Sequence, residues 1–325
     1  MKRQSLKNST ILVIGGAGFI GSHLIDKLIE EKAKEIIILD NLFTGNKENL
    51  TSALEKNNTT LYIDNAENQE TLNYIMEEHD IDIVFNCATK ALNYSFMNPA
   101  NAFLTNVIVL KNLLELQRKK KFKTLCHFSS SEAFGSSQYQ PMDENHPLAP
   151  TTTYAAGKAA ADLMLQSYVT MFDLDAFIVR PFNNYGPRQN FTGPLAGVIP
   201  TTIRKILSNE IPEIHGSGQQ TRDYIYVKDT VDIVTTLYSV IPPGDSVNIT
   251  TDQQLSIEYI METIIDEMNY QGEILRKPNR KADVTSHRGS MKKLQSLIGS
   301  YSKTDFKDGI ALTINWVKQQ VTETN

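Results

Sequence analysis

Short apolar runs alternate with amphipathic segments along the first 180 residues. The apolar runs are rich in β-branched and aromatic residues and favour strands, while the segments between them repeat apolar residues at helical spacing. Predicted strands cover residues 11–14, 35–39, 60–63, 81–85, 122–128 and 175–179, and predicted helices cover 22–31, 67–78, 98–119 and 153–171. This alternation predicts an α/β fold with a doubly wound parallel sheet, whose ligand lies at the carboxyl ends of the strands.

The pattern changes after residue 180, where residues 180–188 are rich in turn formers. Beyond them we expect a smaller α/β domain with helices at 198–209, 227–240, 257–269 and 307–317 and a strand at 247–250. The prediction is therefore a nucleotide-binding domain at 1–180 and a substrate-binding domain at 181–325, leaving open that later segments cross back into the first domain.

Composition narrows the class of protein. The 325 residues are 41% hydrophobic with a formal net charge of -5, which gives no broad basic field for nucleic acid. No apolar stretch approaches the ~20 residues of a membrane span. Cys87 and Cys126 both lie in apolar runs, so no disulfide framework is expected and a cytoplasmic location is the default. The six histidines show no metal-ligand spacing, so we expect no metal.

A glycine-rich loop, Gly15-Gly16-Ala17-Gly18-Phe19-Ile20-Gly21, joins the first predicted strand to the first helix. Glycine permits the tight turn and lets backbone N–H groups approach a pyrophosphate, while the helix N-terminus favours the anion. The second strand ends in Asp40, at the interval where a carboxylate accepts hydrogen bonds from the adenosine ribose. A carboxylate there would repel a 2′-phosphate, so the sequence predicts NAD as the cofactor.

A second group of polar residues follows the strand at 122–128. Ser129, Ser130, Ser131 and Glu132 come directly after it, and Tyr154 and Lys158 stand four residues apart on the next predicted helix. That spacing places the phenol and the ammonium on one helix face, which gives the phenol a reason to ionise more easily than its usual pKa of about 10. Such a pair alone also fits an ordinary solvated helix face.

Taken together, these residues resemble the extended short-chain dehydrogenase/reductase family, specifically its nucleotide-sugar epimerases and dehydratases, which have Rossmann folds. The resemblance covers nearly the whole chain. It rests on the motifs at Gly15–Gly21, Asp40-Asn41 with Thr44-Gly45, Asn106-Val107, Ser129–Gly135, Tyr154-x-x-x-Lys158, Arg180–Arg188 and Gln220–Tyr224.

The resemblance implies a role for each matching residue. The cofactor would contact Gly15, Gly18, Phe19, Ile20, Gly21, Asp40, Asn41, Asp64, Lys90, Tyr154 and Lys158, with Asp64 at the adenine, Asp40 at its ribose and Lys158 at the nicotinamide ribose. An ordinary surface lysine is the alternative for Lys90. The substrate diphosphate would be held by Asn183, Arg222 and Arg288, for which exposed ion pairs of the two arginines are the alternative.

The same resemblance implies a chemistry. Tyr154 would remove the proton from the sugar O4 hydroxyl while C4 gives hydride to NAD, and Ser130 would hydrogen-bond the same oxygen. In the similar sugar 4,6-dehydratases a glutamate at the position of Glu132 takes the C5 proton as the C6 hydroxyl leaves. A glutamate also occurs here in uronate decarboxylases and in a 5,6-dehydratase branch, and the alternative for Glu132 is a loop cap or an ion pair.

Two residues depart from the dehydratase pattern. Phe134 replaces a usual tyrosine, and Ser131 stands where many dehydratases have an aspartate as the acid for the leaving hydroxyl. Ser131 leaves the identity of the acid open between Glu132, once protonated, and a water.

The sequence therefore predicts an NAD-dependent nucleotide-sugar 4,6-dehydratase, a lyase that acts on UDP-N-acetylglucosamine or a similar UDP-hexose. The alternatives are a UDP-sugar 4-epimerase and a non-catalytic NAD-binding sensor. By resemblance we expect a homodimer that pairs through the helices at 98–119 and 153–171.

Overall fold

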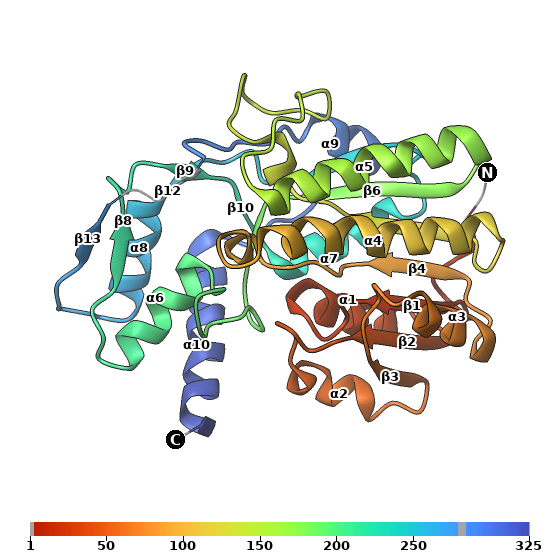
Figure 1. The fold of residues 1–325 in the computed structure, drawn as a ribbon. Coiled ribbons are helices and arrows are strands. Elements are labelled where there is room, and N and C mark those ends of the chain that lie inside the picture. The colour runs from red at the N-terminus through yellow and green to blue at the C-terminus, as the bar shows by residue number, and fades with distance from the viewer. Residues whose placement is uncertain (1–2, 279–283, 325) are drawn as a thin grey trace.

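The computed structural model of the chain describes residues 3–278 and 284–324, and a parallel sheet of seven strands lies at its centre (Figure 1). Its strands are β1 (Thr10–Ile14), β2 (Glu35–Asp40), β3 (Thr59–Ile63), β4 (Ile83–Asn86), β5 (Thr124–Phe128), β6 (Asp175–Pro181) and β11 (Ser246–Ile249). The spatial order is β11-β6-β5-β4-β1-β2-β3, and every neighbouring pair is parallel. The predicted doubly wound Rossmann sheet is confirmed.

Helices cover both faces of this sheet because its central strands are apolar on both sides. The elements on one face are α1 (Phe19–Glu30), α2 (Thr51–Leu54), α7 (Val227–Leu237) and α9 (Lys292–Ile298), and their buried residues share one core with the strands. The elements on the other face are α3 (Gln69–Glu78), α4 (Pro99–Arg118) and α5 (Thr153–Phe172). The long helices α4 and α5 lie side by side across this second face (Figure 1).

A smaller body packs around its own apolar core, at the left in Figure 1. It contains α6 (Val198–Leu207), α8 (Ile257–Glu267), α10 (Phe306–Thr324) and the short strands β7 (Asn183–Tyr185), β8 (Glu213–His215), β9 (Thr221–Arg222), β10 (Tyr224–Tyr226), β12 (Leu255–Ser256) and β13 (Leu275–Lys277). These strands form three two-stranded pairs, β10-β7, β12-β9 and β13-β8. Tyr185, Ile203 and Ile314 are among the buried residues that hold this body together.

The chain crosses between the two bodies more than once. The strand predicted at 247–250 is β11, which pairs with β6 at the edge of the main sheet, and α7 packs on α1. The predicted boundary at residue 180 thus marks where the chain first leaves the main sheet, and the second half returns to it.

In the part of the chain that the structure describes, three short 3-10 helices lie in loops that follow strands of the main sheet: η1 (Lys47–Leu50), η2 (Leu92–Phe96) and η3 (Ser131–Phe134). The sequence pattern did not predict them, because four or five residues are too few to show a period. Among the described residues, no helix combines the length and the apolar character that crossing a bilayer requires.

Candidate active site

The glycine loop forms one wall of a cavity of about 370 Å³ at the carboxyl ends of β1, β2 and β4. Every residue predicted to hold the cofactor except Lys158 lines this cavity: Gly15, Gly18, Phe19, Ile20, Gly21, Asp40, Asn41, Asp64, Lys90 and Tyr154. The fold therefore brings residues from the ends of β1, β2, β3 and β4 and from helices α1 and α5 to the place where a doubly wound sheet binds its ligand.

The loop itself leaves no room for side chains. A Cβ on Gly21 would lie 2.2 Å from the carbonyl oxygen of Gly15, and one on Gly15, whose φ is +75°, would lie 2.8 Å from the backbone of Ala88. Helix α1 begins behind the loop with Gly18 as its N-cap, and no side chain caps it. Its first N–H groups point towards the cavity without an intrahelical acceptor, as a pyrophosphate site requires.

Asp40 fixes the shape of this loop as well as facing the cavity. Its Oδ2 accepts a hydrogen bond of 2.8 Å from the Ala17 N–H, and its Oδ1 accepts one of 2.8 Å from the Leu42 N–H. Burial raises the pKa of this carboxyl, and the backbone donors act in the opposite direction. An anion held here suits ribose hydroxyls and disfavours a 2′-phosphate. These residues fit NAD.

Lys90 is not a surface lysine. Its side chain is buried, and its Nζ lies 3.8 Å from the centroid of the Phe43 ring. Burial lowers the pKa of this amine, while Glu67 and Asp40 act to raise it. Lys90 thus brings a cation to the same cavity as Asp40, in agreement with the predicted place near the cofactor.

Tyr154 lies in the first turn of α5, at the inner end of the cofactor cavity. Helix α5 begins after Thr152, whose side chain accepts a hydrogen bond from the Ala155 N–H at 3.2 Å. The hydroxyls of Ser130 and Thr89 both act to lower the pKa of Tyr154, which places them beside its phenol. The predicted hydrogen bond from Ser130 to the sugar O4 oxygen stays a prediction. Sequence reasoning missed Thr89, because a single threonine after β4 carries no pattern.

Burial works against the predicted easy ionisation of Tyr154. Burial raises the pKa of Tyr154 to about 12, although the hydrogen bonds from Ser130 and Thr89 act to lower it. Burial likewise lowers the pKa of Lys158 to about 8, although Asp162 acts to raise it. The Lys158 Nζ donates to the carbonyl oxygen of Phe128 at 2.7 Å. For both residues, burial changes the pKa more than the neighbouring groups do.

A second cavity of about 390 Å³ lies between the main sheet and the smaller body, and Glu132, Asn183 and Arg222 line it. Leu92, Gln189, Leu195 and Gly197 line both cavities, so the two adjoin. Glu132 lies in η3, and its charge acts to raise the pKa of Tyr154, which places the carboxylate near the phenol. A ligand in the second cavity would meet the cofactor in the first.

Four predicted site residues are not part of these cavity walls: Ser130, Ser131, Lys158 and Arg288. Ser130 forms the N-cap of η3, where its hydroxyl oxygen accepts a hydrogen bond from the Glu132 N–H at 3.2 Å, and it reaches the site through Tyr154. Ser131 is buried behind Glu132, at 2% exposure.

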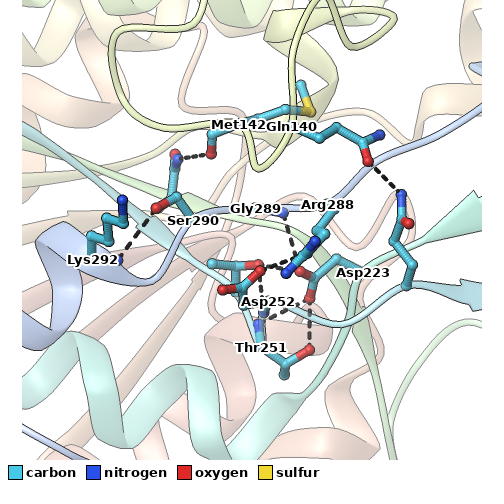
Figure 2. A network of polar contacts seen from close by, with 12 residues as sticks. Gln140, Met142, Asp223, Thr251, Asp252, Arg288, Gly289, Ser290 and Lys292 are labelled. Atoms are coloured by element: carbon cyan, nitrogen blue, oxygen red, sulfur yellow. Dashed lines mark hydrogen bonds and ion pairs between the residues drawn. The ribbon is translucent and has the colours of Figure 1, made fainter.

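The predicted role of Arg288 needs correction. Its Nε donates to Asp252 Oδ1 at 2.7 Å (Figure 2), and it lines neither cavity. Side chains of an extended segment point alternately to opposite sides. The preceding residue, His287, is the one that points inward, with its Nδ1 4.0 Å from Glu132 Oε1. Sequence reasoning missed His287, because the direction of each side chain in this segment cannot be read from the sequence.

The fold and the two adjoining cavities define an NAD-binding enzyme of the Rossmann class, with Tyr154 in the wall of the first cavity and Lys158 buried one turn further along α5. The chain belongs to the NAD dependent epimerase/dehydratase family, whose model matches residues 11–250. NAD is its cofactor.

Similar proteins span more than one activity. A Methanocaldococcus jannaschii protein with a provisional UDP-glucose 4-epimerase name is 36% identical over 95% of this chain and 98% of its own. The structure of a Thermotoga maritima UDP-glucose 4-epimerase with UDP-glucose is 30% identical, with a TM-score of 0.90 over 96% of this chain and 99% of that one. The dTDP-glucose 4,6-dehydratase DesIV of Streptomyces venezuelae, solved with NAD, is 25% identical, with a TM-score of 0.90 over 97% of this chain and 98% of that one.

Proposed function

We propose that this protein is an NAD-dependent nucleotide-sugar 4,6-dehydratase, acting on UDP-N-acetylglucosamine or a similar UDP-hexose and releasing a 4-keto-6-deoxy sugar. The observation that carries the proposal is Glu132, a carboxylate in the wall of the second cavity and close enough to Tyr154 to influence its pKa. A 4-epimerase has little use for a base beside C5, whereas a dehydratase depends on one.

NAD, when bound, supplies the hydride acceptor for C4 and later the hydride donor for C6. The chain's own residues would manage the protons. Tyr154 would take the proton of the O4 hydroxyl, and Ser130 and Thr89, whose hydroxyls lie near its phenol and act to lower its pKa, would orient that oxygen. Lys158, held by the carbonyl of Phe128, would contact the nicotinamide ribose and place a cation behind Tyr154.

Glu132 would then act on the 4-keto sugar. Its carboxylate would remove the C5 proton, which the neighbouring ketone acidifies, and the C6 hydroxyl would leave as water. Asn183 and Arg222, which line the same cavity, would hold the substrate diphosphate. Arg222 belongs to β9, which fixes its backbone against β12.

The test is incubation with UDP-N-acetylglucosamine in deuterated water, followed by mass spectrometry of the sugar nucleotide. We expect loss of one water and incorporation of deuterium at C5. Formation of the C4 epimer without loss of mass would overturn the proposal, and loss of carbon dioxide from a UDP-uronate would indicate a decarboxylase instead.

A UDP-sugar 4-epimerase is the second candidate, favoured by the similarity to the M. jannaschii and T. maritima proteins. Glu132→Gln separates the two, because it keeps the size of the side chain and removes the base. A dehydratase should lose at least about 100-fold in kcat, the scale of a general base, whereas an epimerase should keep most of its rate. Tyr154→Phe is the matched control, since it should abolish either activity.

We further propose a cytoplasmic location, supported by two free thiols, Cys87 and Cys126. Fractionation of the source cells, followed by immunodetection of the protein, would test it.

A further inference from the structure

His287 is a buried histidine whose two ring nitrogens have different surroundings. Its side chain is fully buried, and its Nε2 lies 2.7 Å from the carbonyl oxygen of Gly135. Because a carbonyl oxygen only accepts, this Nε2 carries a hydrogen. The Nδ1 is buried too, and it has no hydrogen-bond partner among the described residues.

The ring is neutral at physiological pH. Burial lowers the pKa of His287 to about 4, and the charges of Arg222 and His146 act in the same direction. With the hydrogen fixed on Nε2, the Nδ1 of a neutral ring is a bare acceptor. This acceptor faces the Glu132 carboxyl, whose nearest oxygen is 4.0 Å away.

The backbone on both sides of His287 is held firmly. The His287 N–H donates to the Thr221 carbonyl at 3.1 Å. In the residues that follow, the Arg288 carbonyl accepts from the Met142 N–H at 2.8 Å, and the Ser290 N–H donates to the Met142 carbonyl at 2.8 Å. Figure 2 shows the side with Met142, Arg288 and Ser290, where Gly289 N also donates to the buried carboxyl of Asp223 at 3.2 Å. The ring therefore keeps its orientation, and Glu132, with three rotatable bonds, is the partner that moves.

A bare ring nitrogen and a carboxylate cannot hydrogen-bond, since both only accept. They can bond once Glu132 gains a proton, after its oxygen moves by roughly 1 Å to reach hydrogen-bond distance. We infer that His287 is a positioning residue that accepts a hydrogen bond from protonated Glu132 and so holds the proton taken from C5 until it passes to the hydroxyl leaving C6.

This inference rests on the proposed dehydration, and its steps balance. The C5–H bond breaks, its proton forms an O–H bond on Glu132, and its electron pair enters the enolate of the 4-keto sugar. The C6–O bond then breaks, C5 and C6 form a double bond, and Glu132 returns the proton to the departing hydroxide as water. Glu132 would thus serve as both base and acid, which accounts for Ser131 in place of an acidic residue.

Two variants distinguish the roles of the two ring nitrogens of His287. His287→Gln places an amide N–H where Nε2 donates to Gly135 and removes the acceptor at Nδ1. His287→Asn places an amide oxygen where Nδ1 lies and loses the bond to Gly135. Circular dichroism and NAD binding report whether each variant is folded, and the loss of Nδ1 should change neither in His287→Gln.

The direct test is an infrared pH titration of the protein without sugar, with the Glu132 carboxyl identified as the protonated-carboxyl band that Glu132→Gln removes. A hydrogen bond to Nδ1 stabilises the protonated form, so in His287→Gln this band should titrate at least one pH unit lower than in the wild type, and His287→Asn should recover part of the difference. Other charges facing the pair, Arg222, His146 and Tyr154, are common to all three proteins. An unchanged midpoint would overturn the inference, whatever the enzyme's reaction proves to be.

A second readout uses the reaction itself. In deuterated water His287→Gln should still exchange the C5 hydrogen of recovered substrate, because Glu132 remains a base, while water loss falls about tenfold or more relative to exchange. An unchanged ratio of water loss to exchange would also overturn the inference. Absence of water loss in the wild type would instead reject the proposed function and leave the infrared result standing.

Discussion

Burial controls the acid-base behaviour of Lys158 more than its neighbours do. The amine is 1% exposed, and its pKa falls to about 8 from an ordinary 10.5 even though Asp162 acts to raise it. Below pH 8 the folded protein therefore carries a buried cation, which reduces its free energy of unfolding. Between pH 8 and 10.5, Lys158 is protonated in the unfolded chain and neutral in the folded one, so stability should rise with pH in this window.

Lys158→Met tests this sign. As the pH rises from 8 to 10.5, the wild type should gain stability relative to the variant. The gain in free energy of unfolding should be about 3 kcal/mol at most, which corresponds to the change in the pKa of Lys158 on folding. Urea denaturation at several pH values measures it, and other titrating groups cancel in the difference. A difference that is flat with pH would contradict the assigned pKa.

Gly21 tests the fit of the cofactor loop. Alanine at this position would bring its Cβ to 2.2 Å from the Gly15 carbonyl oxygen, so the loop must open. We expect Gly21→Ala to weaken NAD binding by about 100-fold or more, a loss on the order of 3 kcal/mol, in isothermal titration calorimetry. Gly299→Ala is the control, because a Cβ on Gly299 has open space around it, and any strain from its φ of +76° arises at the end of α9 and not in the cofactor loop. Equal losses of NAD affinity in both variants would contradict the argument.

At the scale of elements, the N-terminus of α5 links stability to catalysis. Thr152 caps the helix two residues before Tyr154, and the cap is a single side-chain bond to the Ala155 N–H. Thr152→Ala should lower the free energy of unfolding by about 1 kcal/mol, and it should lower kcat because the turn that carries Tyr154 loses its anchor.

Thr152→Ser keeps the hydroxyl and is the matched control for this prediction. It should retain most of the stability and activity in urea denaturation and product assays. Equal effects of alanine and serine would show that packing of the threonine methyl group, and not the cap, is what matters.

The sequence predicted the strands and long helices of the main sheet well, because each is a local pattern. The strand predicted at 81–85 corresponds to β4 (Ile83–Asn86), and the helix predicted at 153–171 corresponds to α5 (Thr153–Phe172). What it could not predict depends on distant contacts. The place of β11 beside β6 is set by pairing across more than 60 residues, as Ser246 opposite Ile178 illustrates.

The candidate site divides in the same way. The cofactor wall could be predicted because its residues follow strand ends in a known order, and Gly15–Gly21 and Asp40 lie where expected. The sequence could not predict that His287, and not Arg288, faces η3, because this depends on which side chain of an extended segment points that way. The pKa of Tyr154 likewise depends on burial, which appears only when α5 packs beside β6 and η3.

At the scale of the whole molecule, the junction of the two bodies is where the two cavities meet. Gln189 and Leu195 come from the connection between β7 and α6, and Leu92 comes from η2 after β4. A cofactor in one cavity and a sugar nucleotide in the other would therefore contact residues from both bodies at once.

The long helices α4 and α5 carry exposed apolar side chains that a single chain does not cover. Leu104 of α4 is 44% exposed, and on α5 Leu163 and Met171 are 55% and 68% exposed. Large apolar side chains gathered on adjacent helices are typical of an interface, and the predicted homodimer would bury them in a bundle of two helices from each chain. This pairing stays a prediction.

Leu163→Glu tests the dimer, because it places a charge at the centre of the exposed face of α5 without touching the core. In sedimentation or light scattering the wild type should have twice the 36.5 kDa mass of one chain, and the variant should have the mass of a single chain. Burying an unpaired carboxylate in an apolar interface costs several kcal/mol, which exceeds what a modest interface supplies. Ile211→Glu is the control, since Ile211 is similarly exposed, at 49%, but lies after α6 in the smaller body. A wild-type monomer, or a dimer that tolerates Leu163→Glu, would move the interface away from α4 and α5.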